Sequence, residues 1–107
     1  MLSNNKIVRA STTEEYVGMV KQAIDEVFDL RQAIEFDEEF LGGDVSVIDD
    51  LEIHLKTLYK SMEDGSYQFA TGDLPYVALL EKYRESLIPF RYLLKRINET
   101  HNKGLEI

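Results

Sequence analysis

Apolar residues recur every three or four positions along most of the chain, which is the spacing of helices that bury one face. The first run predicts a helix over residues 13–41, ended by Gly42-Gly43 in a left-handed cap, with a bend or break near residues 34–37 as the alternative. A capping box can begin this helix in two registers, Ser11 with Glu14 or Thr12 with Glu15. The stripe expected to face the core comprises Tyr16, Val20, Ile24, Val27, Ile34 and Leu41, widened by Ala23 and Phe28.

A second helix is expected from Ser46 to a stop at Asp64-Gly65. The tight glycine connection that precedes it predicts that this helix folds back on the first as an antiparallel αα-hairpin. Its inner face is expected to comprise Ile48, Leu51, Leu55, Leu58 and Met62.

Residues 66–72 alternate aromatic and polar side chains over too few positions for a strand, so we expect an ordered loop pinned by Tyr67 and Phe69. Asp73 is expected to cap a third helix that ends before Pro89. A fourth helix should run from Phe90 to Gly104. The predicted fold class is therefore all-α, a single-domain four-helix bundle built on a long N-terminal αα-hairpin.

The chain is expected to hold one domain, because 107 residues are too few for two separate cores. Residues 1–10 carry no periodic pattern and are expected to be a flexible N-terminal arm, followed by a single helical domain over residues 11–107. The sequence contains no apolar run of the kind found in signal peptides or membrane-spanning helices, so we expect a cytoplasmic protein.

The charge is strongly acidic and unevenly distributed. Lys and Arg number 12 against 20 Asp and Glu, which gives a formal net charge of −8. Most of the acid precedes residue 65, whereas the basic residues of the last third include Arg91 and Lys95, neighbours on one helix face. A chain with this charge is a poor candidate for binding nucleic acid. The absence of Cys excludes disulfides, thiolate metal sites and a cysteine nucleophile.

Paired carboxylates give a candidate metal site. Glu35 and Glu38 share one helical face, and Asp49 and Glu52 repeat this spacing in the next helix. Two such pairs on facing helices can hold Mg²⁺ and present it to a phosphate. The arrangement resembles the paired acidic motifs of all-α nucleotide pyrophosphohydrolases, but the second pair reads D-x-x-E where that family has E-x-x-D.

Neither histidine belongs to a catalytic motif. A ferritin-like di-iron site needs Glu-x-x-His, whereas Leu51 lies three residues before His54 and Asn98 lies three before His101. The sequence also lacks a serine in a nucleophile-elbow context. We therefore expect structural roles for both histidines.

The remaining candidates suit contacts with another protein, because Tyr, Phe and Arg are enriched in interface cores. They combine aromatic rings near charged neighbours with the basic side chains of the last helix. These candidate interaction residues are Phe36, Phe40, Tyr92, Arg91, Lys95 and Arg96.

Two segments, EFDEEFLGG and FATGDLPY, resemble features of short, acidic, all-α bacterial proteins of uncharacterised function. This resemblance implies the fold class and transfers no activity. The leading hypothesis is a non-catalytic helical adaptor or regulatory protein, without a cofactor, that contacts another protein or forms a homo-oligomer. The alternative is a Mg²⁺-dependent all-α nucleotide phosphohydrolase that uses the paired carboxylates.

Overall fold

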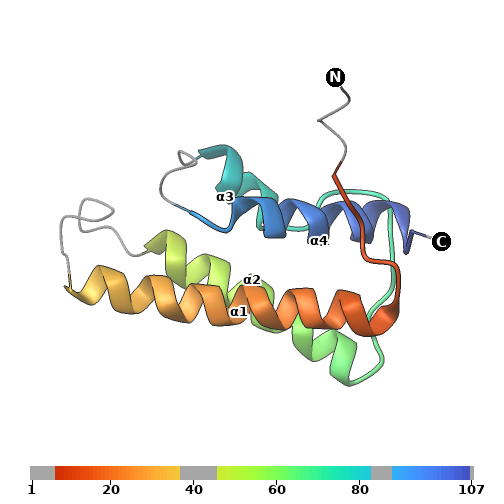
Figure 1. The fold of residues 1–107 in the computed structure, drawn as a ribbon, viewed down its shortest axis with the longest axis horizontal. Helices are drawn as coiled ribbons and strands as arrows, with labels where there is room; N and C mark the ends of the chain where they lie inside the picture. The colour runs from red at the N-terminus through yellow and green to blue at the C-terminus, as the bar shows by residue number, and fades with distance from the viewer. Residues whose placement is uncertain (1–6, 37–45, 83–87, 107) are drawn as a thin grey trace.

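A computed structural model describes residues 7–36, 46–82 and 88–106, and every regular element in these residues is a helix. In chain order the helices are α1 (Thr13–Phe36), α2 (Ser46–Glu63), α3 (Val77–Lys82) and α4 (Arg91–Lys103). The predicted all-α class is confirmed for this part of the chain. Helix α1 packs on both α2 and α4, and α3 packs on α4. Figure 1 shows α1 and α2 running side by side in opposite directions, with α3 and α4 laid over them.

Helix α1 begins in the second of the two predicted capping registers. The Glu15 N–H donates to Thr12 Oγ1 at 3.0 Å, and the Ser11 N–H donates to the Glu15 carboxylate at 2.7 Å. Thr12 is therefore the N-cap, and its hydroxyl satisfies a backbone N–H that the helix leaves without a partner. The predicted extension of this helix over residues 37–41 lies outside the described residues.

The buried stripe of α1 overlaps the predicted one, but it adds Met19 and Leu30 and omits Phe28. Val20, Val27 and Ile34 are buried as expected. Phe28, which we expected to widen the stripe, is 57% exposed. It follows Val27 by one position, which is about 100° around a helix with 3.6 residues per turn, so it points away from the core.

Helix α2 matches its prediction, and α3 does not. The predicted inner face of α2 is buried, apart from the half-buried Met62. The third helix does not begin after Asp73, because the connecting segment has other partners there. Asn98 donates from Nδ2 to the Asp73 carboxylate at 3.0 Å and accepts the Leu74 N–H at 2.8 Å. These bonds replace the expected cap, and α3 begins at Val77.

Two non-helical segments enclose α4, and both are visible in Figure 1. We call residues 7–12 the strap and residues 64–76 the connector. The strap crosses one side of α4 on its way into α1, and the connector follows the other side on its way from α2 to α3. The position of α4 is therefore set by backbone hydrogen bonds as well as by its apolar face.

The strap differs from the flexible arm expected over residues 1–10. The Ala10 N–H donates to Thr100 Oγ1 at 3.0 Å, and Arg96 Nε donates to the Val8 carbonyl at 2.9 Å. The Glu106 N–H in turn donates to the Ala10 carbonyl at 2.8 Å. Residues 8–10 are thus tied to α4 and the C-terminal tail, while residues 1–6 lie outside the described part.

Candidate functional site

The connector lies along the C-terminal half of α4 and bonds to it at several points. The last carbonyl groups of a helix accept no N–H from within the helix, so they need donors from elsewhere. The Ala70 N–H donates to the His101 carbonyl at 3.2 Å. The Gly72 N–H donates to the side-chain oxygen of Asn102 at 2.7 Å. These bonds fix the connector against α4 and place its aromatic residues next to the helix.

A chain of hydrogen bonds joins α1, the connector and α4. The hydroxyl oxygens of Tyr16 and Tyr67 are 2.8 Å apart, and Tyr67 Oη lies 2.7 Å from His101 Nδ1. Tyr16 also donates to the Ile97 carbonyl at 3.2 Å. Phe69 stacks on the Tyr16 ring, with 5.7 Å between the ring centroids. The expectation that Tyr67 and Phe69 pin the loop is therefore met by specific contacts.

The number of available protons fixes which group donates in each of these hydrogen bonds. A carbonyl can only accept, so the single Tyr16 hydroxyl proton is directed to Ile97. Tyr67 then donates to Tyr16 and accepts the Nδ1–H of His101, which leaves Nε2 as the acceptor of the imidazole. Burial raises the pKa of Tyr16 and Tyr67 and lowers the pKa of His101. All three groups are therefore neutral at neutral pH.

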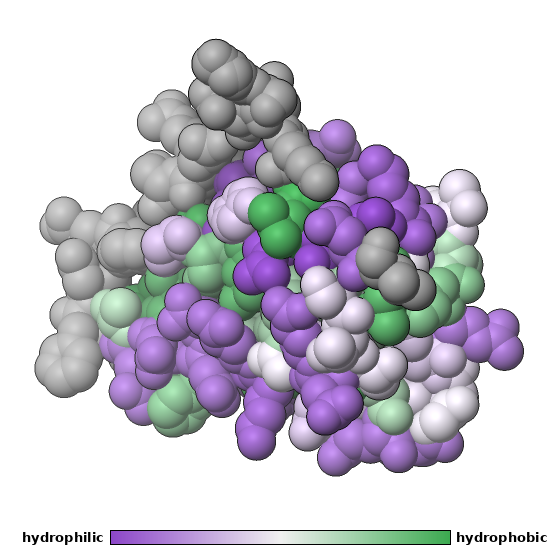
Figure 2. Space-filling model, turned by 45° about the vertical axis from the view of Figure 1, so that its right-hand side comes forward, coloured by the Kyte–Doolittle hydropathy of each residue, from purple (hydrophilic) through white to green (hydrophobic). Residues whose placement is uncertain are grey.

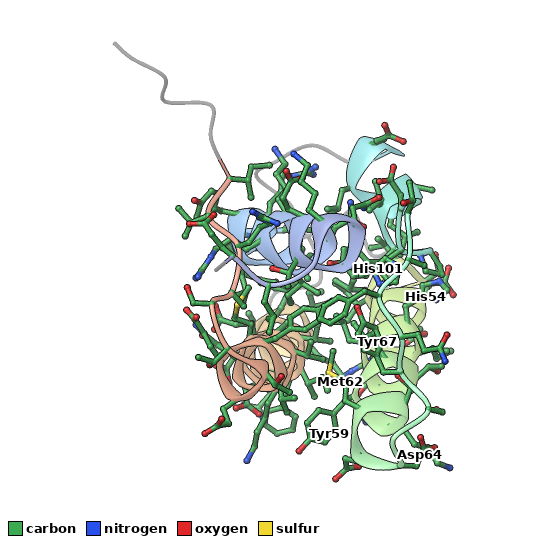
Figure 3. The ribbon with its side chains drawn as sticks, turned by 90° about the vertical axis from the view of Figure 1, so that its right-hand side faces the viewer. His54, Tyr59, Met62, Asp64, Tyr67 and His101 are labelled. Atoms are coloured by element: carbon green, nitrogen blue, oxygen red, sulfur yellow. The ribbon has the colours of Figure 1, made fainter. Side chains whose placement is uncertain are left out.

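Both histidines of the chain line one cavity of about 330 Å³ between α2, the connector and α4, which we call the His cavity. Figure 3 shows His54 on α2, Tyr67 on the connector and His101 on α4 on the same side of the molecule. The other lining residues are apolar or uncharged: Thr57, Leu58, Ser61, Ser66, Gln68, Leu74, Pro75 and Tyr76. Sequence reasoning missed this site because it considered each histidine beside its chain neighbours only.

The structure separates the predicted basic interaction residues into engaged and exposed ones. Arg96 donates to the Val8 carbonyl and lies 3.4 Å from the Glu15 carboxylate. The Arg91 guanidinium donates to the Leu80 carbonyl. Lys95 is exposed, as is Tyr92 at 54%. The outer face of α4 therefore offers less positive charge to a partner than its sequence suggests.

A hollow of about 370 Å³ adjoins Tyr92, and we call it the Tyr92 hollow. Its described lining residues are Ile88, Pro89, Arg91, Tyr92 and Lys95. The face drawn in Figure 2 is mainly hydrophilic, with hydrophobic residues in separate patches. A hollow beside an exposed aromatic ring is the type of surface that can receive an apolar side chain of another molecule.

The second carboxylate pair of the proposed metal site is held by cations of the chain itself. Arg31 on α1 reaches across to α2 and donates to Asp49 at 2.8 Å and to Glu52 at 2.6 Å. Lys56 lies 2.9 Å from the other oxygen of Glu52. Lys56 and then Arg31 lower the pKa of Glu52. A divalent ion would therefore compete with these cations for Asp49 Oδ1 and both oxygens of Glu52.

The candidate residues between positions 35 and 40 fall outside the description. This applies to Glu38 and Phe40, and to the side chains of Glu35 and Phe36 at the end of α1. Within the described residues, no group of three or more His, Asp or Glu side chains is arranged to hold a metal ion. The structure thus describes only the Asp49 and Glu52 half of the site proposed for Mg²⁺, and that half contacts Arg31 and Lys56.

Comparisons with protein-family models, with curated proteins and with solved structures found no match to this chain. Among the helices that the structure describes, none has both the length and the apolar character required to cross a membrane.

Proposed function

We propose that the protein is a non-catalytic helical adaptor or regulatory protein that contacts other proteins through the Tyr92 hollow. The observation that supports this is an exposed Tyr92 beside Pro89 and Lys95 at that hollow. Exposed aromatic residues next to a receiving hollow are typical of interface hot spots. The positive charge of Lys95 favours an acidic partner surface.

A second copy of the chain carries a surface of this kind on α1. Phe28 is exposed, and the carboxylates of Asp25, one turn earlier, and Asp29, the next residue, are exposed as well. We therefore propose self-association in which Phe28 of one copy enters the Tyr92 hollow of another. In a two-fold symmetric dimer the same contact would form twice, which doubles its contribution.

We also propose the bundle architecture and the cytoplasmic location expected from the sequence. The opposed directions of α1 and α2 and the core that they share with α4 support a four-helix bundle built on an αα-hairpin. Such a bundle would hold the Phe28 and Tyr92 surfaces at a fixed distance from each other. We propose that this scaffold works in the cytoplasm.

Sedimentation velocity from low to high micromolar concentration tests the self-association. We expect the wild type to associate, and we expect Tyr92→Ser and Phe28→Ser each to weaken association by about tenfold or more, as hot-spot truncations do. Ile53→Ser is the matched control, because Ile53 is 61% exposed and belongs to neither surface. A wild type that stays monomeric throughout the range would overturn the self-association.

Charge exchange tests the pairing more directly. Lys95→Glu should weaken association, and adding Asp29→Lys to the same chain should restore it if the two residues face each other between copies. A double variant that associates as weakly as Lys95→Glu alone would contradict this pairing. The wider adaptor role would also fail if no protein bound immobilised wild type more strongly than Tyr92→Ser.

A further inference from the structure

The His cavity has an unusual composition for this chain. Asp, Glu, Lys and Arg make up 30% of the sequence, yet none of the described residues that line the cavity is of these four types. Burying a charged ligand without a partner of opposite charge is strongly unfavourable. Apart from its two histidines, the described lining therefore offers an ionic ligand no side chain of opposite charge.

His101 adds no positive charge to this lining. His101 Nδ1 is bonded to the neutral Tyr67 hydroxyl, and burial lowers the pKa of His101, so its imidazole is uncharged at neutral pH. The ring of His101 thus offers hydrogen-bonding atoms and a flat face rather than a positive charge.

The remaining lining divides into an apolar wall and a polar side. Leu58, Leu74 and Tyr76 are buried and provide apolar contact surface. Thr57 and Gln68 are exposed and provide hydrogen-bonding groups near the opening. The volume of about 330 Å³ lies at the small end of the range of roughly 300–1,000 Å³ that is typical of small-molecule sites.

We propose that the His cavity binds an uncharged small ring compound, with its apolar body against Leu74 and Tyr76 and a hydrogen-bonding edge towards His54 and Thr57. This ligand site is separate from the Tyr92 hollow and does not depend on self-association. It gives the adaptor a place where a neutral metabolite can bind.

Three probes of the same shape test the charge preference: benzamide is neutral, benzoate is negative and benzamidinium is positive. The readout is the proton NMR signals of the two imidazole rings, assigned with His54→Gln and His101→Asn. We expect benzamide to shift both sets of ring signals saturably. We expect each of the two charged probes to bind at least about tenfold more weakly than benzamide. Absence of a saturable shift with benzamide, or equal binding of a charged probe, would overturn the proposal.

A substitution that fills the cavity tests the location. Thr57→Phe places a large side chain at the lining on α2, where exposure of the position favours normal folding. Ile53→Phe, one turn earlier on the same helix and outside the lining, is the matched control. We expect Thr57→Phe to weaken benzamide binding at least tenfold and Ile53→Phe to leave it unchanged. Unchanged binding in Thr57→Phe would place the probe elsewhere and refute the site.

Discussion

Thr100 connects the strap to α4 through one hydroxyl group. Its side chain is fully buried, accepts the Ala10 N–H and donates to the Arg96 carbonyl at 2.8 Å. The position follows Ile97 by three residues, so it continues the buried face of the helix with a polar side chain. The strap can pass over a buried part of α4 because this hydroxyl satisfies its backbone.

Thr100→Val keeps the shape of the side chain and removes the hydroxyl. The Ala10 N–H would then be buried without a partner, which should lower the free energy of unfolding by about 1–3 kcal/mol. Thr100→Ser keeps the hydroxyl and loses one methyl group, with an expected cost of about 1 kcal/mol. Urea unfolding measures both, and hydrogen exchange at Ala10 should accelerate in the valine variant alone. Equal exchange rates at Ala10 in the wild type and the valine variant would contradict the hydrogen bond assigned to Thr100.

Tyr67→Phe removes the hydroxyl between Tyr16 and His101 while retaining the ring. We expect a loss of about 1–3 kcal/mol in the free energy of unfolding, because His101 Nδ1–H loses its acceptor in a partly buried place. Tyr59→Phe is a suitable control, since Tyr59 is half-buried on α2 and outside this chain of bonds. A loss no larger than that of the control would show that the hydrogen bonds of Tyr67 contribute no stability.

At the scale of the elements, the end of α4 shows how local conformation and distant residues combine. Gly104 has a φ of +82° and donates its N–H to the Thr100 carbonyl at 2.7 Å. The Arg9 guanidinium donates to the carbonyls of Lys103 and Gly104, where the helix dipole favours a positive charge. The sequence predicted the glycine stop, whereas the arginine of the strap is more than ninety residues away in the chain.

Gly104→Ala and Gly18→Ala should have opposite effects. Gly104 combines a φ of +82° with a ψ of −175°, a conformation that is essentially restricted to glycine, so we expect a loss of about 1–3 kcal/mol. Gly18 is exposed within α1 with open space around it, so alanine should stabilise the helix by about 0.5–1 kcal/mol. Thermal and urea unfolding measure both changes. The same sign for both variants would refute this reading of the two sites.

The helices were predictable where one apolar face decides their position. In α2 the predicted start at Ser46 and the buried residues Leu51 and Leu55 agree with the structure. In the segment before α3 the side chain of Asn98 forms hydrogen bonds with the Asp73 carboxylate, which was expected to cap a helix, and with the Leu74 N–H. No local sequence pattern reveals this partner. Prediction therefore fails where long-range polar contacts compete with helix formation.

The ion pairs between α1 and α2 should contribute little stability and little metal binding. Arg31, Asp49 and Glu52 are partly exposed, so Arg31→Gln should cost less than about 1 kcal/mol, and the difference should shrink at high salt. Calorimetry should detect no Mg²⁺ binding in the wild type. Stronger Mg²⁺ binding in Arg31→Gln would instead support the carboxylate site, because the substitution removes the competing cation.

At the scale of the whole molecule, both candidate surfaces depend on the placement of α4. The His cavity unites α2, the connector and α4, and the Tyr92 hollow adjoins the beginning of α4. Tyr92 and Lys95 could be named from the sequence as candidate interaction residues, because helical spacing indicates which residues share a face. Sequence analysis missed the joint site of His54 and His101 because contact between distant segments follows from the fold and not from their neighbours in the chain.

The stability of the whole molecule should fall as the pH drops from neutral to mildly acidic. Burial holds the pKa of His101 below its ordinary value of 6.5, so the unfolded chain takes up this proton more readily than the folded one. The free energy of unfolding should therefore begin to decrease as the pH falls through about 6.5, and the decrease should continue until the folded imidazole is protonated too. The measurements should stay above the pH range in which carboxylates ordinarily titrate. Glu52 then does not affect the comparison, because its pKa is lowered and its contribution to stability is lost only in more acidic solution.

His101→Asn isolates this effect, because the amide retains a hydrogen-bonding group near the position of Nδ1 and has no titration in this range. Its stability should fall less than that of the wild type over the same window. Urea unfolding at a series of pH values gives both curves. Parallel curves for the wild type and His101→Asn would mean that the imidazole titrates alike in the folded and unfolded chain, and the neutral character assigned to the His cavity would lose its physical basis.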